Sequence, residues 1–221
     1  MLKDLWRAET LASALPAQLK KPGPALQPQI RSSHGLEQFF SSIQGQENLS
    51  LLDFSGASQA NISFITSLGY RIYSNDALRT MEEAFGGSGD FVAQQSDPER
   101  AAQFLRETLD FPDQSFDGAL LWDTLQFLEP PLVDDAVERL HRILRPQSLL
   151  LAFFHAEEKA QQAPLFTYRI VDSKSMSLAP RGQSRPAKYF NNRSLEKLFQ
   201  KFSSVKFFLT RDHLREVIVR R

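Results

Sequence analysis

The stretch FDGALLWDTLQFLEPPLVDDAVERLHRILRPQSLLLAFF, residues 116–154, decides the fold. It begins and ends with short apolar runs, 116–122 and 148–154, whose length is typical of buried strands. Between them, residues 132–144 place apolar side chains on one face of a helix, which Pro146 ends. Two buried strands joined by a helix predict a parallel pair with a crossover helix.

The same alternation runs upstream of this unit. Short apolar runs predict three further strands, over residues 49–54, 70–74 and 91–95. Helical spacing and end signals predict helices over residues 35–45, 59–68, 77–85 and 96–109. The last of these begins at Ser96-Asp97-Pro98-Glu99, where Ser or Asp caps the helix and Pro lies in its first turn.

The C-terminal part adds a helix over 193–202 and two strands, 205–209 and 215–220. The short connection between these strands predicts an antiparallel pair. We therefore expect a doubly wound, three-layer α/β sandwich, with a mostly parallel seven-stranded sheet that a C-terminal antiparallel hairpin closes.

The N-terminal residues differ from the rest. Residues 1–15 predict a short amphipathic helix, and four prolines between 16 and 30 predict an extended arm. We expect residues 1–34 to form this helix and Pro-rich arm, and residues 35–221 to form one Rossmann-like domain.

Composition excludes several classes of protein. The chain of 221 residues has no cysteine, which excludes a disulfide scaffold, a thiolate nucleophile and cysteine-ligated metal. Its longest apolar run, Leu149–Phe154, is far shorter than the ~20 residues of a membrane span. The N-terminus lacks the apolar core of a secretory signal, so we expect a soluble, cytoplasmic protein with no membrane partner.

Charge is unevenly distributed along the chain. Residues 1–165 hold 13 Lys and Arg against 22 Asp and Glu, and residues 166–221 hold 13 against 4. A basic C-terminal quarter suits an anionic substrate or RNA. The alternative is that the two regions neutralise each other within one fold. Because no RNA-binding motif is present, we expect no nucleic-acid partner.

Polar residues stand at the carboxyl ends of the expected strands, where ligands bind in such folds. Asp53 ends one strand and precedes the small-residue loop Ser55-Gly56-Ala57. Asp76 follows the next strand and is suited either to accept hydrogen bonds from ribose hydroxyls or to cap the next helix. Asp123 and His155 end two further strands, and His155 is either a general base or a polar turn residue. The histidines show no ligand spacing, so we expect no metal.

Four segments resemble motifs of the class I S-adenosylmethionine-dependent methyltransferases. Leu51-Leu52-Asp53 with its small-residue loop is similar to the first motif of that family, and residues 69–76 are similar to the second. Residues 116–125 resemble the stretch around its fourth strand, and residues 140–146 resemble the segment before its fifth. The resemblance covers residues 35–221 and includes the closing hairpin.

This resemblance implies S-adenosylmethionine as cofactor, with S-adenosylhomocysteine as product. It assigns the methionine end of the cofactor to the first loop, with Asp53, Ser55, Gly56 and Ala57. It assigns the ribose to Asp76, the adenine to Asp97 or Ser96, and the methionine moiety or methyl channel to Asp123. Asp97 serves equally well as a helix cap, and both interpretations stay open.

The first loop departs from the family pattern. Aligned from Asp53, the three usual glycine positions hold Ser55, Ala57 and Gln59, while Gly56 is out of phase. Glycine there allows close approach of the backbone to a ligand. Ser and Ala are small enough to keep that approach, whereas Gln59 either caps the next helix or intrudes on the cofactor.

The segment 156–192 is long and lacks a clear helix, so we expect it to cover the substrate. Its candidate substrate-binding residues are Tyr168, Arg185 and Tyr189. The basic side chains favour a small-molecule acceptor that is anionic. The sequence identifies no catalytic side chain, because methyl transfer depends largely on positioning.

The sequence leaves three candidate functions. The favoured one is methyl transfer from S-adenosylmethionine to an unidentified acceptor. The alternative is a non-catalytic protein of the same fold that binds a partner, which the glycine-poor loop favours. A nicotinamide-dependent reductase is disfavoured, since residues 55–60 lack the G-x-G-x-x-G pattern.

Overall fold

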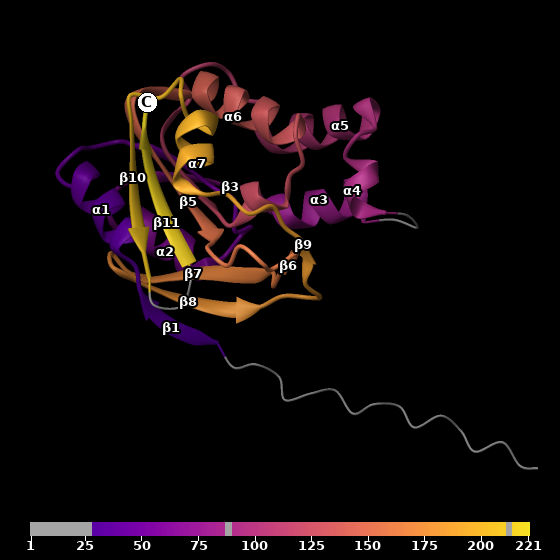
Figure 1. Cartoon of the computed structure of the whole chain (residues 1–221). Helices are drawn as coiled ribbons and strands as arrows, with labels where there is room; N and C mark the ends of the chain where they lie inside the picture. Colours follow the sequence, from indigo (N-terminus) through magenta and orange to yellow (C-terminus); the bar gives the residue numbers. More distant parts are fainter. Residues whose placement is uncertain (1–27, 87–89, 211–213) are drawn as a thin grey trace, which may run out of the picture.

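The large sheet has six strands within residues 28–86, 90–210 and 214–221, the residues that the computed structural model describes. They are β2 (Ser50–Asp53), β3 (Arg71–Ser74), β4 (Phe116–Trp122), β5 (Leu144–His155), β10 (Ser204–Leu209) and β11 (Leu214–Arg220). They pair in the order β10-β11-β5-β4-β2-β3 (Figure 1). β2, β3, β4 and β5 run parallel, and β11 and β10 complete the sheet as antiparallel strands.

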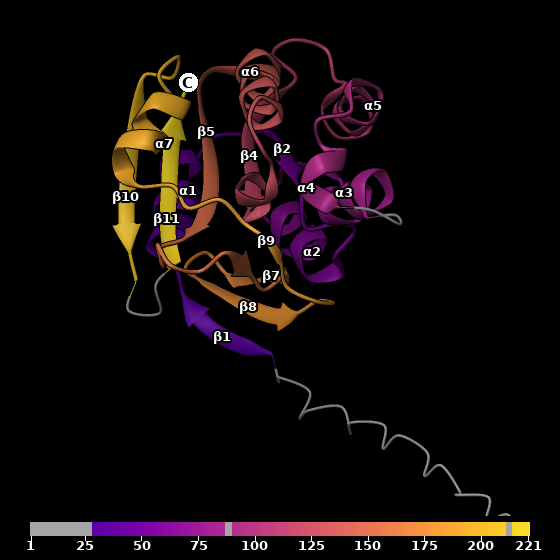
Figure 2. The ribbon, with the colours of Figure 1, turned by 45° about the vertical axis from the view of Figure 1, so that its right-hand side comes forward.

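Helices cover both faces of this sheet. They are α1 (His34–Ile43), α2 (Gln59–Ser67), α3 (Ala77–Phe85), α4 (Phe91–Gln94), α5 (Pro98–Leu109), α6 (Leu132–Ile143) and α7 (Asn192–Leu198), with a 3-10 helix over Thr124–Phe127. α1 and α2 share one face, where Phe40 and Phe64 pack edge to face at 5.0 Å. α6 and α7 lie on the opposite face (Figure 2). The predicted doubly wound α/β sandwich is confirmed.

β5 occupies the middle of the sheet, between β4 and β11. All of its residues from Ser148 to Phe154 are buried, because both faces of the strand are covered by helices. This confirms the prediction from the apolar run over 148–154.

A second, smaller sheet lies across the carboxyl ends of the parallel strands (Figure 1). Its strands are β1 (Gln29–Ser32), β8 (Ser175–Pro180) and β7 (Phe166–Asp172), paired antiparallel in the order β1-β8-β7. A short pair, β6 (Gln162–Ala163) with β9 (Arg185–Pro186), flanks it. The small sheet therefore covers the edge at which such folds bind ligands.

Glu216 of β11 ties the small sheet to the large one. Its carboxylate is fully buried and accepts hydrogen bonds from the Ser33 hydroxyl at 2.9 Å and the Gly35 amide at 2.6 Å. It also pairs with the Arg31 guanidinium of β1 at 3.0 Å. A buried charge persists only when it is paired and hydrogen-bonded, and these three donors meet that need.

Two expectations for the middle of the chain are corrected. Residues 91–95 were expected to form a strand, but Phe91–Gln94 form the short helix α4, so the sheet has six strands and not seven. Asp90 explains the difference, since its side chain accepts a hydrogen bond from the Val92 amide and caps this turn. Of the four residues of α4, only Phe91 is buried.

Two other predictions concern the segment 156–192 and the N-terminal residues. The cover expected over residues 156–192 contains the regular strands β6 to β9. The helix predicted over residues 1–15, and most of the arm, lie outside the described residues. β1 falls within the predicted arm, and the boundary at residue 34 stays a prediction. Among the described helices, none combines the length and apolar character needed to cross a membrane.

Candidate functional site

The loop after β2 packs against the residue that follows β3. The Asn75 amide donates to the Asp53 carbonyl at 2.8 Å, and the Gly56 amide donates to the Asn75 carbonyl at 3.1 Å. Gly56 has φ of +80°, and a Cβ there would lie 3.2 Å from the Asp76 carboxylate. Glycine is therefore required where the loop approaches Asp76. This brings Ser55, Gly56 and Asp76 together, as the sequence predicts.

This loop borders a cleft of about 440 Å³ at the carboxyl edge of the sheet. We call it the outer cleft; it is lined by residues 55–60, Asp76, Thr167, Arg169 and Arg181. The first turn of α2 opens onto it, and no side chain caps that helix among the described residues. Free amide groups at a helix N-terminus favour negatively charged ligand groups. The outer cleft thus combines amide donors, one carboxylate and two guanidinium groups.

Asp53, directly below the outer cleft, is fully buried. Its carboxylate accepts hydrogen bonds from the Ser55 amide (3.0 Å) and hydroxyl (2.8 Å). Asn61 Nδ2 at 2.9 Å and Trp122 Nε1 at 2.6 Å are further donors. Burial raises the pKa of Asp53 above its ordinary value, although these hydrogen bonds lower it. Asp53 therefore organises the loop and has no exposed surface for a ligand.

Tyr168 of β7 packs on Trp122, whose Nε1 donates to Asp53. Its ring stacks on Trp122 with the centroids 5.0 Å apart and an interplanar angle of 9°, and only 1% of the residue is exposed. Asn61 of α2 holds the strand in place, since its Oδ1 accepts from the Ile170 amide at 2.7 Å. Asn61 Nδ2 also lies 3.4 Å from the Tyr168 carbonyl. The edge of β7 is therefore hydrogen-bonded to a side chain of α2.

Asp123, which follows β4, lies on the same side of the sheet and is fully buried. Burial raises the pKa of Asp123 to about 7, and a hydrogen bond from Tyr168 opposes that rise. We call Asp53, Asn61, Trp122, Asp123 and Tyr168 the sealed layer. All five residues are buried, and none of them lines the outer cleft.

Arg181, which follows β8, and Arg185 of β9 both form ion pairs with acidic residues of α3 or its N-cap. Arg181 Nη1 lies 2.8 Å from Asp76 Oδ1, and the same oxygen accepts the Arg79 amide as the cap of α3. Arg185 pairs with Glu82 at 3.1 Å and lies over the Phe91 ring at 5.6 Å. The Asp76 carboxylate is therefore already engaged by a cation of the same chain.

The remaining predicted residues lie apart from this cleft. Asp97 caps α5 through the Glu99 and Arg100 amides, at 2.9 and 3.3 Å. Tyr189 is half-buried and does not line the outer cleft. The His155 amide donates to Gln126 Oε1 at 2.8 Å. Among the described residues, no group of three or more acidic or histidine side chains is placed to hold a metal.

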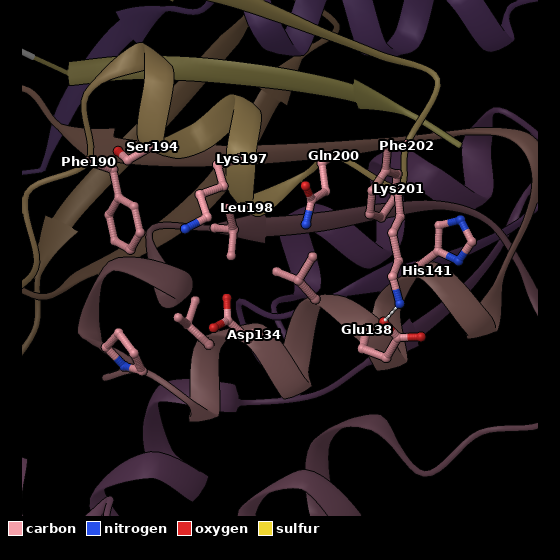
Figure 3. Close-up of a pocket in the computed structure, with 13 residues that line it drawn as sticks. Asp134, Glu138, His141, Phe190, Ser194, Lys197, Leu198, Gln200, Lys201 and Phe202 are labelled. Carbon is pink, nitrogen blue, oxygen red and sulfur yellow. Dashed lines mark hydrogen bonds and ion pairs between the residues drawn. The ribbon is translucent and has the colours of Figure 1, made fainter.

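A second pocket, of about 370 Å³, lies between α6 and α7 (Figure 3). Apolar side chains including Phe190 and Leu198 line it, and Glu138 and Lys201 form an ion pair at its rim. It is formed by helices on one face of the sheet and contains none of the predicted site residues.

The sequence interpretation missed Asn61 as a site residue, and it included Arg181 among the basic residues of the expected cover without predicting its contact with Asp76. Asn61 is a polar residue in the first turn of a helix, and nothing local indicates that it meets a strand more than a hundred positions away. Arg181 lies in the basic segment 156–192, but its partner Asp76 is 105 positions earlier in the chain.

A comparison with protein-family models identifies the central part of the chain. The model described as a methyltransferase domain matches residues 52–152, from the end of β2 through most of β5. Residues 52–152 are therefore similar to a methyltransferase domain. The resemblance to class I S-adenosylmethionine-dependent methyltransferases is thereby confirmed. The comparison with curated proteins returns no match.

Solved structures with a similar fold include several methyltransferases at low sequence identity. One is a Burkholderia thailandensis 1,6-didemethyltoxoflavin-N1-methyltransferase with bound 1,6-didemethyltoxoflavin and S-adenosylhomocysteine. It is 13% identical, the match covers 85% of this chain and 76% of that one, and the TM-score is 0.48. A Methanosarcina mazei S-adenosylmethionine-dependent methyltransferase is 17% identical, with 82% and 96% coverage and a TM-score of 0.47. An Aquifex aeolicus enzyme of the same description is 12% identical, with 84% and 88% coverage and a TM-score of 0.43.

Proposed function

We propose that the protein binds S-adenosylmethionine in the outer cleft of its methyltransferase domain and transfers the methyl group to a small-molecule acceptor. The observation that carries this proposal is the contact between the Ser55–Ala57 loop and Asp76 at adjacent strand ends. The domain match over residues 52–152 supports it.

The outer cleft has the chemistry that this cofactor needs. The backbone of Gly56 approaches closely because it has no Cβ, and the amides of the first turn of α2 open onto the cleft. Asp76 supplies a carboxylate that accepts hydrogen bonds from a pair of ribose hydroxyls. Its volume of about 440 Å³ lies within the range of ligand pockets. Deeper binding is excluded in this arrangement, because Tyr168 and Trp122 fill the sealed layer.

In this function the cofactor supplies a methyl group activated on a positively charged sulfur. The protein's own contribution is to bind and orient the two reactants and to keep water away from them. Ser55, Gly56 and Ala57 form the wall of the cleft, and Asp76 fixes its far end. Tyr168 and Trp122 are buried and do not line the cleft, so they contact a ligand only if β7 moves. Asp123 stays a candidate for the methionine side of the site, reached only when Tyr168 moves.

The acceptor proposed here is an anionic small molecule. Arg169 and Arg181 line the outer cleft, and the segment from residue 166 onward carries 13 Lys and Arg against 4 Asp and Glu. Guanidinium groups bind carboxylate and phosphate groups through paired hydrogen bonds. Arg185 and Tyr189 stay predicted substrate-binding residues, and the cytoplasmic location stays a prediction.

Titration calorimetry with S-adenosylmethionine and S-adenosylhomocysteine tests the proposal, once co-purified cofactor has been removed. Asp76→Asn is expected to weaken binding about tenfold, which corresponds to ~1.4 kcal/mol. Asp97→Asn is the matched control, since asparagine caps a helix as well as aspartate and Asp97 lies outside the cleft. Equal affinity in Asp76→Asn would refute the ribose assignment. A loss in Asp97→Asn would support the adenine assignment instead.

The sealed layer favours a second candidate, a non-catalytic protein that keeps the fold and binds a partner. In this case Tyr168 and Trp122 are permanent core residues, and no cofactor enters. Folded protein that fails to bind either ligand at millimolar concentration would support this candidate and exclude the first.

A further inference from the structure

The carboxylate that the proposed function assigns to ribose is bonded within the chain. Arg181 Nη1 lies 2.8 Å from Asp76 Oδ1, and 28% and 29% of the two side chains are exposed. Oδ1 also accepts the Arg79 amide. A ligand that binds Asp76 through hydroxyl groups must therefore share or displace Arg181.

Arg181 belongs to the segment that covers the site. Its amide donates to the Leu165 carbonyl at 2.8 Å, directly beyond the Phe166↔Pro180 pair of β7 and β8. The open end of this hairpin therefore borders the outer cleft, while Tyr168 further along β7 stacks on Trp122. The hairpin with the residue that follows it thus contacts both the carboxylate assigned to ribose and the buried Trp122 ring.

The two ends of the small sheet are held differently. At one end, Ser32 of β1 pairs with Ser175, and Arg31 is anchored to the buried Glu216 carboxylate. At the other end, the Arg181 side chain forms a partly exposed ion pair with Asp76. Partly exposed ion pairs contribute little to stability, whereas buried charges with several donors are hard to break. We therefore expect the Arg181 end of the small sheet to detach before the end that is anchored to Glu216.

We propose that the segment 166–181 is an autoinhibitory cover, and that Arg181 holds it closed by occupying Asp76 until the cofactor displaces it. This inference rests on the proposed function and adds a regulatory step at the same site. Release of Arg181 frees the Asp76 carboxylate and loosens the hairpin end, and movement of Tyr168 then exposes Trp122. Cofactor affinity thus depends on competition between the cofactor and Arg181 for the Asp76 carboxylate.

Calorimetry with S-adenosylhomocysteine on the full chain tests this competition. Arg181→Ala is expected to tighten binding roughly two- to fivefold, the range expected from loss of a partly exposed ion pair. Arg181→Lys keeps the charge and is expected to bind like the wild type. Arg145→Ala is the matched control, because it removes another Arg–Asp pair, with Asp117, which lies outside the outer cleft.

A second readout follows the cover itself. The chain has two tryptophans, so Trp6→Phe leaves Trp122 as the single reporter of Tyr168 stacking. S-adenosylhomocysteine is expected to change Trp122 emission and to speed hydrogen exchange at the Ile170 amide. Without ligand, Arg181→Ala is expected to change Trp122 emission and the exchange rate of the Ile170 amide in the same directions as the ligand does in the wild type.

The outcomes separate this inference from the proposed function. Binding by the wild type with equal affinity in Arg181→Ala, or with unchanged Trp122 emission, overturns the cover and leaves the function standing. Weaker binding in Arg181→Ala also overturns it, since Arg181 would then be a ligand-binding residue. Absence of binding in every variant, Arg181→Ala included, overturns both.

Discussion

The outer cleft and the sealed layer occupy the same edge of the sheet but differ in chemistry. In the outer cleft, Asp76 and Arg181 are partly exposed, and the Asp76 carboxylate has two donors, the Arg181 guanidinium and the Arg79 amide. In the sealed layer, Asp53 is fully buried and four donors satisfy it. The comparison teaches that strand ends of one fold can serve either as a ligand surface or as core. The elements that cover a strand end decide whether it becomes a ligand surface or part of the core.

Hydrogen bonding explains why the two regions respond differently to change. A buried polar group that loses its partner costs much more free energy than an exposed one, because water cannot replace the lost bond. Substitutions in the sealed layer are therefore expected to change stability. Substitutions in the outer cleft are expected to change ligand affinity with little effect on stability.

The largest effect is expected from Asp123→Asn, measured as a function of pH. The pKa of Asp123 rises from 3.8 to about 7 in the folded protein, so between these values the folded state binds more protons than the unfolded chain. Stability contributed by this group therefore falls as pH rises from about 4 to 7, by roughly 4 kcal/mol in total.

Asp123→Asn removes this dependence, so at pH 8 the variant is expected to be more stable than the wild type. Near pH 4 the two should be nearly equal. Urea unfolding at pH 4.5, 6 and 8 measures the difference, and Asp53 is common to both proteins. A difference that is the same at every pH would show that Asp123 does not titrate in this range.

The next effect is expected from Asn61→Ala. This change leaves the Ile170 amide without its acceptor and removes one donor from Asp53. Two buried groups lose a partner, and the expected loss of stability is about 3 kcal/mol.

Urea denaturation compares this variant with Asn191→Ala, which removes the exposed cap of α7 and is expected to cost about 1 kcal/mol. Equal losses in the two variants would contradict the distinction between buried and exposed contacts. That distinction would be strengthened if hydrogen exchange along β7 became faster in Asn61→Ala and stayed unchanged in Asn191→Ala.

Much of the fold could be predicted because the deciding signals are local. The apolar run over 148–154 and the helical spacing over 132–144 each match one element closely. The start of α5 was visible because its Ser-Asp-Pro-Glu sequence satisfies the free amides of a helix. Residues 91–95 were misinterpreted because a short apolar run fits a strand or one helical turn equally well, and only Asp90 distinguishes them.

The candidate site was predictable only where neighbouring strands bring residues together. Asp53 and Asp76 end adjacent parallel strands, so their proximity follows from the fold. The pair between Asp76 and Arg181 joins residues 105 positions apart, and no local pattern reports it. The burial of Tyr168 was also predictable in part, because Tyr168 and Ile170 alternate with exposed residues, as on a half-buried strand.

The smallest effect is expected from Gln59→Ala, on the rim between the two regions. Gln59 holds the third glycine position of the family loop, where a long side chain was expected to cap the helix or intrude on the cofactor. In the structure Ser58 precedes α2 as its N-cap residue, and Gln59 is exposed with its amide donating to Ser63 Oγ at 3.0 Å. A side chain that extends along its own helix does not fill the cleft that it borders.

Gln59→Ala is therefore expected to change S-adenosylhomocysteine affinity by less than about twofold, or ~0.4 kcal/mol, in calorimetry. Ala57→Gln is the matched comparison, since it places the same side chain two residues earlier, on the wall of the cleft, and is expected to weaken binding. If Gln59→Ala instead tightened binding about tenfold, the loop itself would be the obstruction. The Gln59 side chain would then limit cofactor binding, which is the role that the proposed cover assigns to Arg181.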